Sequence, residues 1–207
     1  MNQSVSKLMF IFPGQGSQYR GMGSDLHHEF ASARKVYEEA GEALGYDIAE
    51  LSFRDPEGVL DKTEFTQPAV LTHSLACLAA FRELCGGRVE PAIAGGHSLG
   101  EYSALAAAGA LSLRDAVSLV QHRGRILGEY GRGLMAALPL DAATVRGIAP
   151  RFYCGIGGCN VPDQTVVGGA AEDLEALVAY VKDQYQTRAT VLNVEGAFHT
   201  HLMVTAA

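Results

Sequence analysis

One short segment of this sequence combines a candidate nucleophile with the backbone geometry that would expose it. Gly96-His97-Ser98-Leu99-Gly100 has the pattern G-x-S-x-G. Between a strand and a helix, such a turn holds the serine hydroxyl clear of the backbone in a strained conformation. The adjoining helix N-terminus favours developing negative charge. The pattern therefore predicts Ser98 as a nucleophile and the Leu99 N–H as an oxyanion donor, against the simpler interpretation of a serine that caps a helix.

A second glycine-rich segment, Phe12-Pro13-Gly14-Gln15-Gly16-Ser17-Gln18, follows the first predicted strand. A dinucleotide-binding loop would need G-x-G-x-x-G, and Tyr19 stands where the third glycine is required. A loop at a strand end can instead direct the Gln15 N–H at a substrate oxygen. We expect Gln15 to be the second oxyanion donor, with an ordinary strand-end turn as the alternative.

A serine nucleophile needs a base, and a histidine is the usual one. His97 adjoins Ser98, but on a sharp turn its side chain should diverge from the serine. His199 and His201 follow Gly196 after the last predicted strand, where a glycine bend can present an imidazole. Sequence position alone does not separate these two histidines. The remaining candidates are His27, His28, His73 and His122.

Arg123 is the candidate for anion recognition. Helical spacing places it near Leu119, Val120 and Leu127, on the buried face of its helix. A buried guanidinium keeps its proton and needs an anionic partner. That partner is either a substrate carboxylate or an Asp or Glu in a structural ion pair.

Hydrophobic periodicity and turn residues predict the elements that position these groups. Leu8 to Phe12 is a continuous apolar run typical of a strand buried on both faces of a parallel sheet. A helix is expected to open at Thr66, with Pro68 in its first turn. Another begins at Ser112, which Asp115 complements in an approximate capping box. The expected elements of this part are helices over 29–44, 67–84, 99–108 and 112–128 and a strand over 91–96.

From Gly133 onward the predicted order is βαββαβ, a ferredoxin-like pattern. The strands are expected over 134–138, 152–156, 165–167 and 189–194, and the helices over 141–148 and 172–183. The fold class is therefore α/β, with a large parallel-sheet domain over 1–130 plus 196–207 and a small inserted domain over 131–195.

Composition excludes several classes of function. The 207 residues carry a formal charge of −7 and are 48% hydrophobic, which argues against disorder and against nucleic-acid binding by bulk charge. The uncharged apolar stretches 68–81 and 102–113 are shorter than the roughly 20 residues of a membrane helix. Residues 1–11 lack the features of a signal peptide. The four cysteines have no metal-ligand spacing, so we expect no metal and a reduced, cytoplasmic protein.

The two glycine motifs, together with Gln121-His122-Arg123-Gly124 and Gly196-Ala197-Phe198-His199, resemble the malonyl-CoA:acyl carrier protein transacylase family in order and spacing. That family includes the acyltransferases of polyketide synthases. The resemblance covers essentially the whole chain, although family members continue beyond the position of Ala207. It implies an α/β-hydrolase-like large domain and agrees with the small domain predicted above.

The resemblance implies transfer of a malonyl group from malonyl-CoA to the phosphopantetheine thiol of an acyl carrier protein, with no tightly bound cofactor. Ser98 would be the nucleophile and His199 the base, with the Gln15 and Leu99 amides as the oxyanion hole. Arg123 would bind the malonyl carboxylate. The other implied substrate-binding residues are Gln67, Asn160, Phe198, Leu127 and His97.

Two substitutions depart from the family pattern. Leu127 stands where many relatives have Met, and Cys159-Asn160-Val161-Pro162 replaces a more usual Asn-Ser-Pro. Two other functions stay open beside malonyl transfer. One is acyl-thioester hydrolysis, in which the arginine is commonly absent, and the other is a non-catalytic domain that docks carrier proteins.

Overall fold

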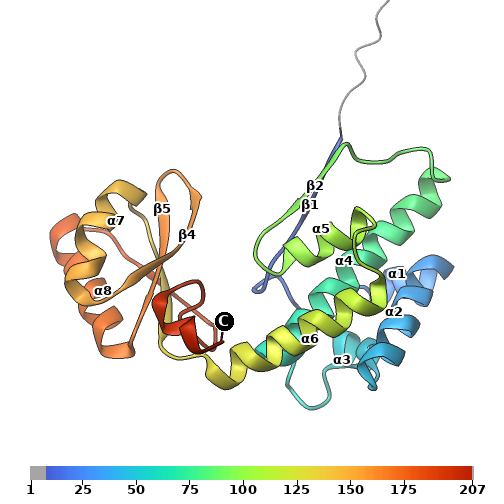
Figure 1. Cartoon of the computed structure of the whole chain (residues 1–207), viewed down its shortest axis with the longest axis horizontal. Coiled ribbons are helices and arrows are strands. Elements are labelled where there is room, and N and C mark those ends of the chain that lie inside the picture. Colours follow the sequence, from blue (N-terminus) through green and yellow to red (C-terminus); the bar gives the residue numbers. More distant parts are fainter. Residues whose placement is uncertain (1–7, 207) are drawn as a thin grey trace, which may run out of the picture. The chain divides into compact units, whose positions relative to one another are not determined.

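The computed structural model describes residues 8–206, which form two compact units. The first unit ends at Gly124 and the second begins at Arg125, so the boundary lies within the helix α6 (Leu113–Tyr130) (Figure 1). Both units mix helices and strands. The expected α/β class is therefore confirmed. The expectation that residues 1–11 lack the features of a signal peptide concerns a segment whose first seven residues lie outside the described part of the chain.

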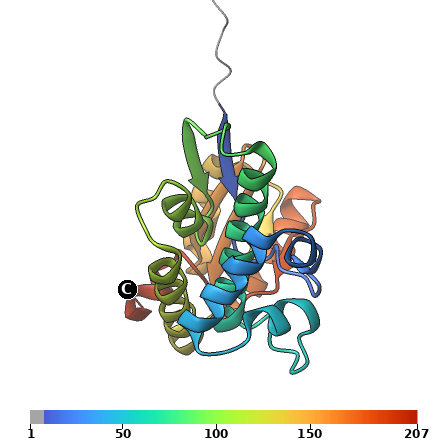
Figure 2. The ribbon, with the colours of Figure 1, turned by 90° about the vertical axis from the view of Figure 1, so that its right-hand side faces the viewer.

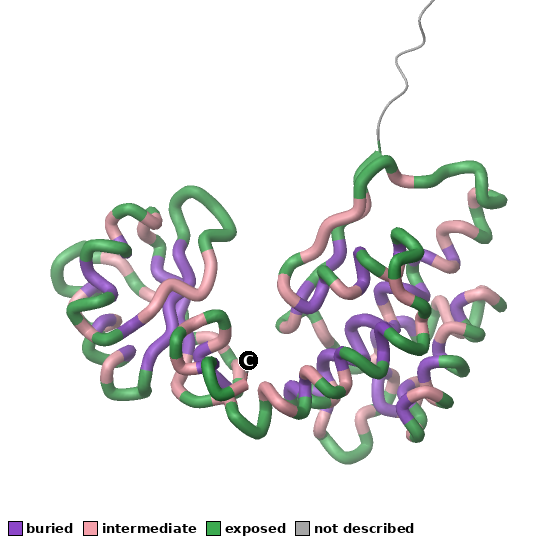
Figure 3. Tube along the Cα trace, in the orientation of Figure 1, coloured by how far each residue is buried: buried purple, intermediate pink, exposed green. Residues whose placement is uncertain are grey.

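The first unit is mainly helical around a small parallel sheet. Its strands β1 (Met9–Phe12) and β2 (Ile93–Gly96) pair in register from Met9↔Ile93 to Phe12↔Gly96. Helix α2 lies along α4, as Figures 1 and 2 show. Most of the buried residues of this unit belong to its helices (Figure 3). The helices are α1 (Ser24–Glu29), α2 (Ala31–Leu44), α3 (Ile48–Arg54), α4 (Thr63–Cys85), α5 (Gly100–Ala107) and α6.

The expectation that the first strand is buried on both faces is wrong. Phe10 packs edge-on against Phe81 of α4 at a ring distance of 5.4 Å, and Phe12 is buried. Met9 and Ile11, however, are 50% and 75% exposed. Within residues 8–206 this sheet has only two strands, so one row of β1 side chains has no element to cover it.

Helix α4 begins four residues earlier than the proline suggested. Lys62 is its N-cap, and the Lys62 carbonyl already accepts from the Phe65 and Thr66 amides. Thr66 is therefore not a cap, and its hydroxyl donates to the Leu60 carbonyl at 2.5 Å. Pro68 lies inside the helix rather than in its first turn.

Helix α6 begins as predicted and approaches α4 very closely. The Ser112 hydroxyl accepts from the Asp115 amide at 3.0 Å, which confirms the cap. A Cβ on Gly124 would lie 2.8 Å from the Thr63 carbonyl oxygen and 3.0 Å from Glu64 Cα. The absence of a side chain at Gly124 thus allows the two helix backbones to meet.

The second unit is a four-stranded antiparallel sheet in the order β4-β5-β3-β6. Its strands and helices follow one another in the predicted order, strand, helix, strand, strand, helix, strand. Figure 1 shows α7 and α8 beside the sheet, and the buried side chains of α8 pack with those of β3 and β5. The elements are β3 (Leu134–Leu138), α7 (Ala142–Ile148), β4 (Gly155–Val161), β5 (Gln164–Gly169), α8 (Ala171–Tyr185), β6 (Thr190–Leu192) and the 3₁₀ helices Ala149–Phe152 and His201–Ala206.

The predicted strand over 152–156 is wrong in its first half. Pro150 lies at the start of a 3₁₀ helix that ends at Phe152, and Tyr153 caps it with a left-handed φ of 52°. The strand begins only at Gly155 and continues to Val161, because it pairs with β5 in a hairpin.

Residues after Gly196 pack on the second unit. The Ala197 amide donates to the Arg132 carbonyl at 2.8 Å, and Ala197 is fully buried beside Gly168 of β5. The structure accordingly groups them with the second unit. The assignment of 196–207 to the large domain, and of 131–195 to the small one, stays a prediction. No described helix combines the length and apolar character needed to cross a membrane.

Gly124→Ala should lower the free energy of unfolding by about 1 to 3 kcal/mol, because the new methyl group would overlap the backbone of α4. Gly128→Ala is the matched control on the same helix. Its Cβ would meet only Glu195 Oε2 at 3.9 Å, so the change should stabilise the helix by up to about 1 kcal/mol. Urea unfolding monitored by circular dichroism measures both. Equal stabilisation by the two changes would contradict the close contact between α4 and α6.

Candidate active site

Ser98 lies on a strained turn between β2 and α5, as the motif predicts. Its φ is 53°, in the left-handed region that side chains other than glycine rarely adopt. A Cβ on Gly96 would collide with the Gly100 main chain, and one on Gly100 would collide with the Phe12 carbonyl. Both glycines are therefore required by sterics, and the serine between them bears the strain.

A left-handed φ outside a helix end distinguishes Ser98 and His199 from the other described residues. Besides glycines, residues 8–206 contain five positive φ values. Those of Asp55, Tyr153 and Gln186 belong to C-caps, where this conformation is ordinary. Ser98 and His199, with φ of 53° and 60°, are not C-caps. Such strain concentrates at functional positions.

The two expected oxyanion donors are both available. Neither the Leu99 N–H nor the Gln15 N–H donates to another described residue. The loop that carries Gln15 lies against the turn, because a Cβ on Gly14 would be 2.7 Å from the His97 carbonyl oxygen and 3.1 Å from its Nδ1. His97 itself is exposed. The Ser17 hydroxyl donates to the Gly14 carbonyl at 2.7 Å and holds this loop.

A chain of side-chain hydrogen bonds joins the expected residues of the first unit. Arg123 donates through Nη2 to Ser98 Oγ at 2.9 Å and through Nη1 to Gln67 Oε1 at 2.8 Å. Gln67 Nε2 donates to Gln15 Oε1 at 3.4 Å. Gln15 Nε2 then donates to Thr63 Oγ1 at 3.0 Å. The structure thus connects Ser98, Arg123, Gln67 and Gln15, which come from four separate segments of the chain.

The Arg123 guanidinium is half-buried and lies over the Tyr102 ring, 5.7 Å from its centroid. It forms no ion pair with any described carboxylate, so the alternative of a structural ion pair is wrong for residues 8–206. Burial lowers the pKa of Arg123 below its usual value, and nearby Tyr102 and Glu101 act in the opposite direction. A guanidinium nevertheless stays protonated, so the site holds a cation that forms no ion pair with a described carboxylate, although the charge of Glu101 acts on it from nearby.

Thr63 and Tyr102 are members of this site that the sequence analysis missed. Thr63 and Gln67 stand four residues apart on α4, and therefore on one helix face. The predicted start of that helix at Gln67 concealed this relation. Tyr102 follows the G-x-S-x-G motif by two residues, and only the packing of α5 shows that its ring lies under Arg123.

The remaining expected residues lie in the second unit or at its start. His199 is exposed on a turn, whereas His201 begins a 3₁₀ helix beside Gly155 of β4. Phe198 packs against Met135 and Val166 of the sheet. Asn160 is exposed on β4, and Leu127 is half-buried on α6. Their participation in a site with Ser98 stays a prediction.

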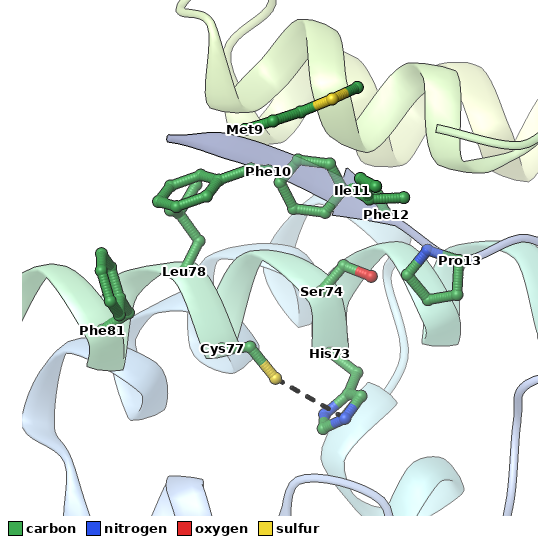
Figure 4. Close-up of a pocket in the computed structure, with 10 residues that line it drawn as sticks. All are labelled: Met9, Phe10, Ile11, Phe12, Pro13, His73, Ser74, Cys77, Leu78 and Phe81. Atoms are coloured by element: carbon green, nitrogen blue, oxygen red, sulfur yellow. Dashed lines mark hydrogen bonds between the residues drawn. The ribbon is translucent and has the colours of Figure 1, made fainter. Parts of the chain in front are cut away.

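A separate groove of about 400 Å³ lies between β1 and α4 (Figure 4). Cys77 Sγ there lies 3.7 Å from His73 Nε2. Burial raises the pKa of the Cys77 thiol and lowers the pKa of His73, so both groups are neutral and the thiol is not activated. Of the candidate residues from the sequence, the groove contains only His73, and it contains neither Ser98 nor Arg123. No group of three or more His, Cys, Asp or Glu among the described residues could hold a metal.

Residues 9–207 match the family model described as "Acyl transferase domain". The malonyl CoA-acyl carrier protein transacylase of Bacillus subtilis (strain 168) is 40% identical over 98% of this chain and 66% of its own length. The chain therefore spans about two thirds of that relative. A malonyl CoA-acyl carrier protein transacylase structure from Clostridium perfringens superposes with a TM-score of 0.89 at 38% identity, covering 97% of this chain and 65% of that one.

A further solved relative is a malonyl-transacylase in complex with its type II polyketide synthase acyl-carrier protein. It has a TM-score of 0.90 and 35% identity, covering 97% of this chain and 67% of that one. The chain belongs to the malonyl-CoA:acyl carrier protein transacylase family, which includes acyltransferases of polyketide synthases.

The free energy of unfolding of Ser98→Gly should exceed that of Ser98→Ala by about 1 kcal/mol, because only glycine adopts the left-handed φ without strain. The same two changes at Ser103, inside α5, should give the opposite sign, since alanine is the better helix former. Urea unfolding measures all four variants. A Ser98→Ala variant as stable as Ser98→Gly would show that the turn is relaxed.

Proposed function

We propose that this protein transfers a malonyl group from malonyl-CoA to the phosphopantetheine thiol of an acyl carrier protein, through an acyl-Ser98 intermediate. One observation carries the proposal: a half-buried guanidinium without a carboxylate partner donates to the hydroxyl of the candidate nucleophile. An acyl group attached to Ser98 would therefore extend toward a cation. A carboxylate at its far end meets that requirement, and a bidentate pair is the strongest form it takes.

In the first half-reaction, Ser98 Oγ attacks the thioester carbonyl while His199 accepts the hydroxyl proton. The resulting oxyanion accepts hydrogen bonds from the Gln15 and Leu99 amides. When the C–S bond breaks, the CoA sulfur takes the proton from His199 and leaves malonyl-Ser98. In the second half-reaction the carrier thiol gives its proton to His199 and attacks the ester, which restores the Ser98 hydroxyl.

The resemblance to the family also implies the residues that would surround the acyl group. Gln67 orients the Arg123 guanidinium through its Oε1, and His97 flanks the nucleophile. Asn160, Leu127 and Phe198 would complete the pocket. The Phe198 ring would oppose a methyl branch on the extender unit, which is worth about 1 to 3 kcal/mol and gives a preference for malonyl over methylmalonyl.

The proposed domain organisation follows the same comparison. Residues 1–130 with 196–207 would form the catalytic domain with an α/β-hydrolase-like nucleophile turn, and 131–195 a ferredoxin-like subdomain. The strand order β4-β5-β3-β6 supports the latter. The solved complex of a relative with an acyl-carrier protein supports the partner. The reaction would serve fatty acid or polyketide biosynthesis in the cytoplasm, without a tightly bound cofactor.

Brief incubation with malonyl-CoA should add one malonyl group to the wild-type chain, and Ser98→Ala should abolish this adduct. The nucleophile is lost in this variant, whereas the Gln15 and Leu99 donors remain. Intact-mass spectrometry measures the adduct, and peptide mapping places it. An adduct on Ser98→Ala at a comparable rate would overturn the assignment. A wild-type chain without an adduct would favour a domain that only docks carrier proteins.

The same measurement separates the two histidines. His199→Ala should slow acylation severely, because the base is removed, while His201→Ala should have a mild effect. The reverse order would transfer the role of base to His201.

Arg123→Ala should reduce malonyl loading by about a hundredfold or more and leave acetyl loading unchanged or faster. Truncation leaves the malonyl carboxylate buried without a partner, at a cost of about 3 to 5 kcal/mol. An acetyl group has no carboxylate to lose. Loading rates with malonyl-CoA and acetyl-CoA test this, with Arg114→Ala, an exposed arginine on the same helix, as control. A parallel loss for both substrates would show that Arg123 is structural. A loss confined to malonyl loading would also favour malonyl transfer over thioester hydrolysis of neutral acyl groups.

A further inference from the structure

In the structure, the arginine proposed to bind the substrate carboxylate is hydrogen-bonded to the nucleophile itself. Arg123 Nη2 donates to Ser98 Oγ at 2.9 Å, and Nη1 donates to Gln67 Oε1 at 2.8 Å. A hydroxyl and an amide oxygen, both neutral, thus accept from the two ends of one guanidinium. This arrangement has a consequence for which substrates can react.

We propose that Arg123 restrains Ser98 in the free protein, and that a carboxylate in the pocket releases the nucleophile by drawing the guanidinium away from Oγ. This inference rests on the proposed function, because it requires Ser98 to be acylated. It adds that the carboxylate of the substrate acts on reactivity as well as on binding.

The electrostatics of the site support such an exchange. A carboxylate carries a full charge and accepts two parallel N–H bonds, so it competes strongly with a hydroxyl for the guanidinium. Arg123 has no carboxylate partner among the described residues, and burial disfavours its unpaired charge. Glu101 acts on the charge of Arg123 from nearby but forms no ion pair with it. A carboxylate entering the pocket would therefore find the guanidinium with only neutral hydrogen-bond partners among the described residues.

The restraint follows from the use of the Oγ lone pairs. The Arg123 N–H donates to lone-pair density on Oγ, and attack on the acyl carbon draws on the same density. Part of this hydrogen bond must therefore be lost before the transition state is reached. An interaction that favours the ground state over the transition state slows the step.

The neighbouring contacts allow the Arg123 guanidinium to move between two positions, one hydrogen-bonded to Ser98 Oγ and one paired with a substrate carboxylate. Gln67 is buried and its amide nitrogen is engaged with Gln15 Oε1, so its Oε1 stays directed at Arg123. The Tyr102 ring lies below the guanidinium and tolerates a lateral shift, since a cation–π contact has no fixed partner atom. Nη2 can thus leave Ser98 while Nη1 keeps its partner.

An acetyl group and a free formate ion together supply the two parts of a malonyl group. We therefore expect formate to accelerate acylation of Ser98 by acetyl-CoA, by about fivefold or more, because a hydrogen bond from a charged donor is removed from Oγ. In that step the Oγ–C bond forms, the C–S bond breaks, and the serine proton ends on the CoA thiol. Intact-mass spectrometry measures the acetyl-Ser98 adduct at increasing formate, with sodium chloride holding the ionic strength constant.

Three controls separate this inference from the proposed function. Arg114→Ala should respond to formate as the wild type does, and Arg123→Ala should not respond. Formate should also inhibit malonyl loading competitively, because it occupies the position of the malonyl carboxylate. Inhibition of malonyl loading without acceleration of acetyl loading would overturn the inference and leave the proposed function standing. No effect of formate on either substrate would overturn the inference, whereas only the absence of malonyl loading itself would contradict the proposed function.

A spectroscopic readout tests the exchange without acylation. In the chain labelled with ¹⁵N-arginine, the Arg123 guanidinium resonances should differ between wild type and Ser98→Ala, because Oγ is missing from the variant. Saturating formate should remove this difference, since Arg123 then no longer contacts residue 98. A difference that persists unchanged in formate would overturn the inference, even in a preparation with slow acylation.

Discussion

No carboxylate among residues 8–206 forms an ion pair with the half-buried guanidinium of Arg123. The arrangement of the first unit around this guanidinium follows from that constraint. A buried cation must be satisfied by hydrogen bonds and by polarisable groups when no anion pairs with it directly. Gln67, Ser98 and the Tyr102 ring provide these contacts. Gln67 in turn engages Gln15, and Gln15 engages Thr63. The residues that would bind the acyl group and those that would stabilise its oxyanion therefore belong to one network.

This network depends on close contacts between backbone segments at positions where only glycine fits. At Gly124, α6 meets the first turn of α4, and that contact sets Arg123 beside Gln67. At Gly14, the loop that carries Gln15 meets His97, and at Gly100 the nucleophile turn meets the end of β1. Each of these glycines borders a functional residue rather than filling a flexible loop. A methyl group at any of them would move a hydrogen-bonding partner by more than a hydrogen bond tolerates.

The remaining strain is confined to the two residues proposed to move protons and form bonds. Ser98 and His199 adopt left-handed φ values without the helix end that makes this conformation ordinary elsewhere in the described chain. Different contacts hold the backbone at the two residues. At Ser98, the close main-chain contacts of Gly96 and Gly100 hold the turn, whereas His199 follows a buried segment in which the Ala197 amide donates to the Arg132 carbonyl. In both cases the neighbouring backbone is rigid enough to maintain a conformation that the residue itself disfavours.

The sequence by itself determined the local features. Glycine spacing marked the nucleophile turn, Ser112 marked the start of α6, and periodicity marked the alternation of strands and helices in the second unit, because these depend on neighbours within a few residues. The partners of Arg123 were decided by tertiary structure alone. The sequence led us to expect an anionic partner, whereas an amide and a hydroxyl accept from the guanidinium in the structure. Periodicity does not report which acceptor another element presents. The early start of α4, the exposed face of β1 and the roles of Thr63 and Tyr102 likewise depend on contacts between segments distant in sequence, and a local pattern carries no record of those contacts.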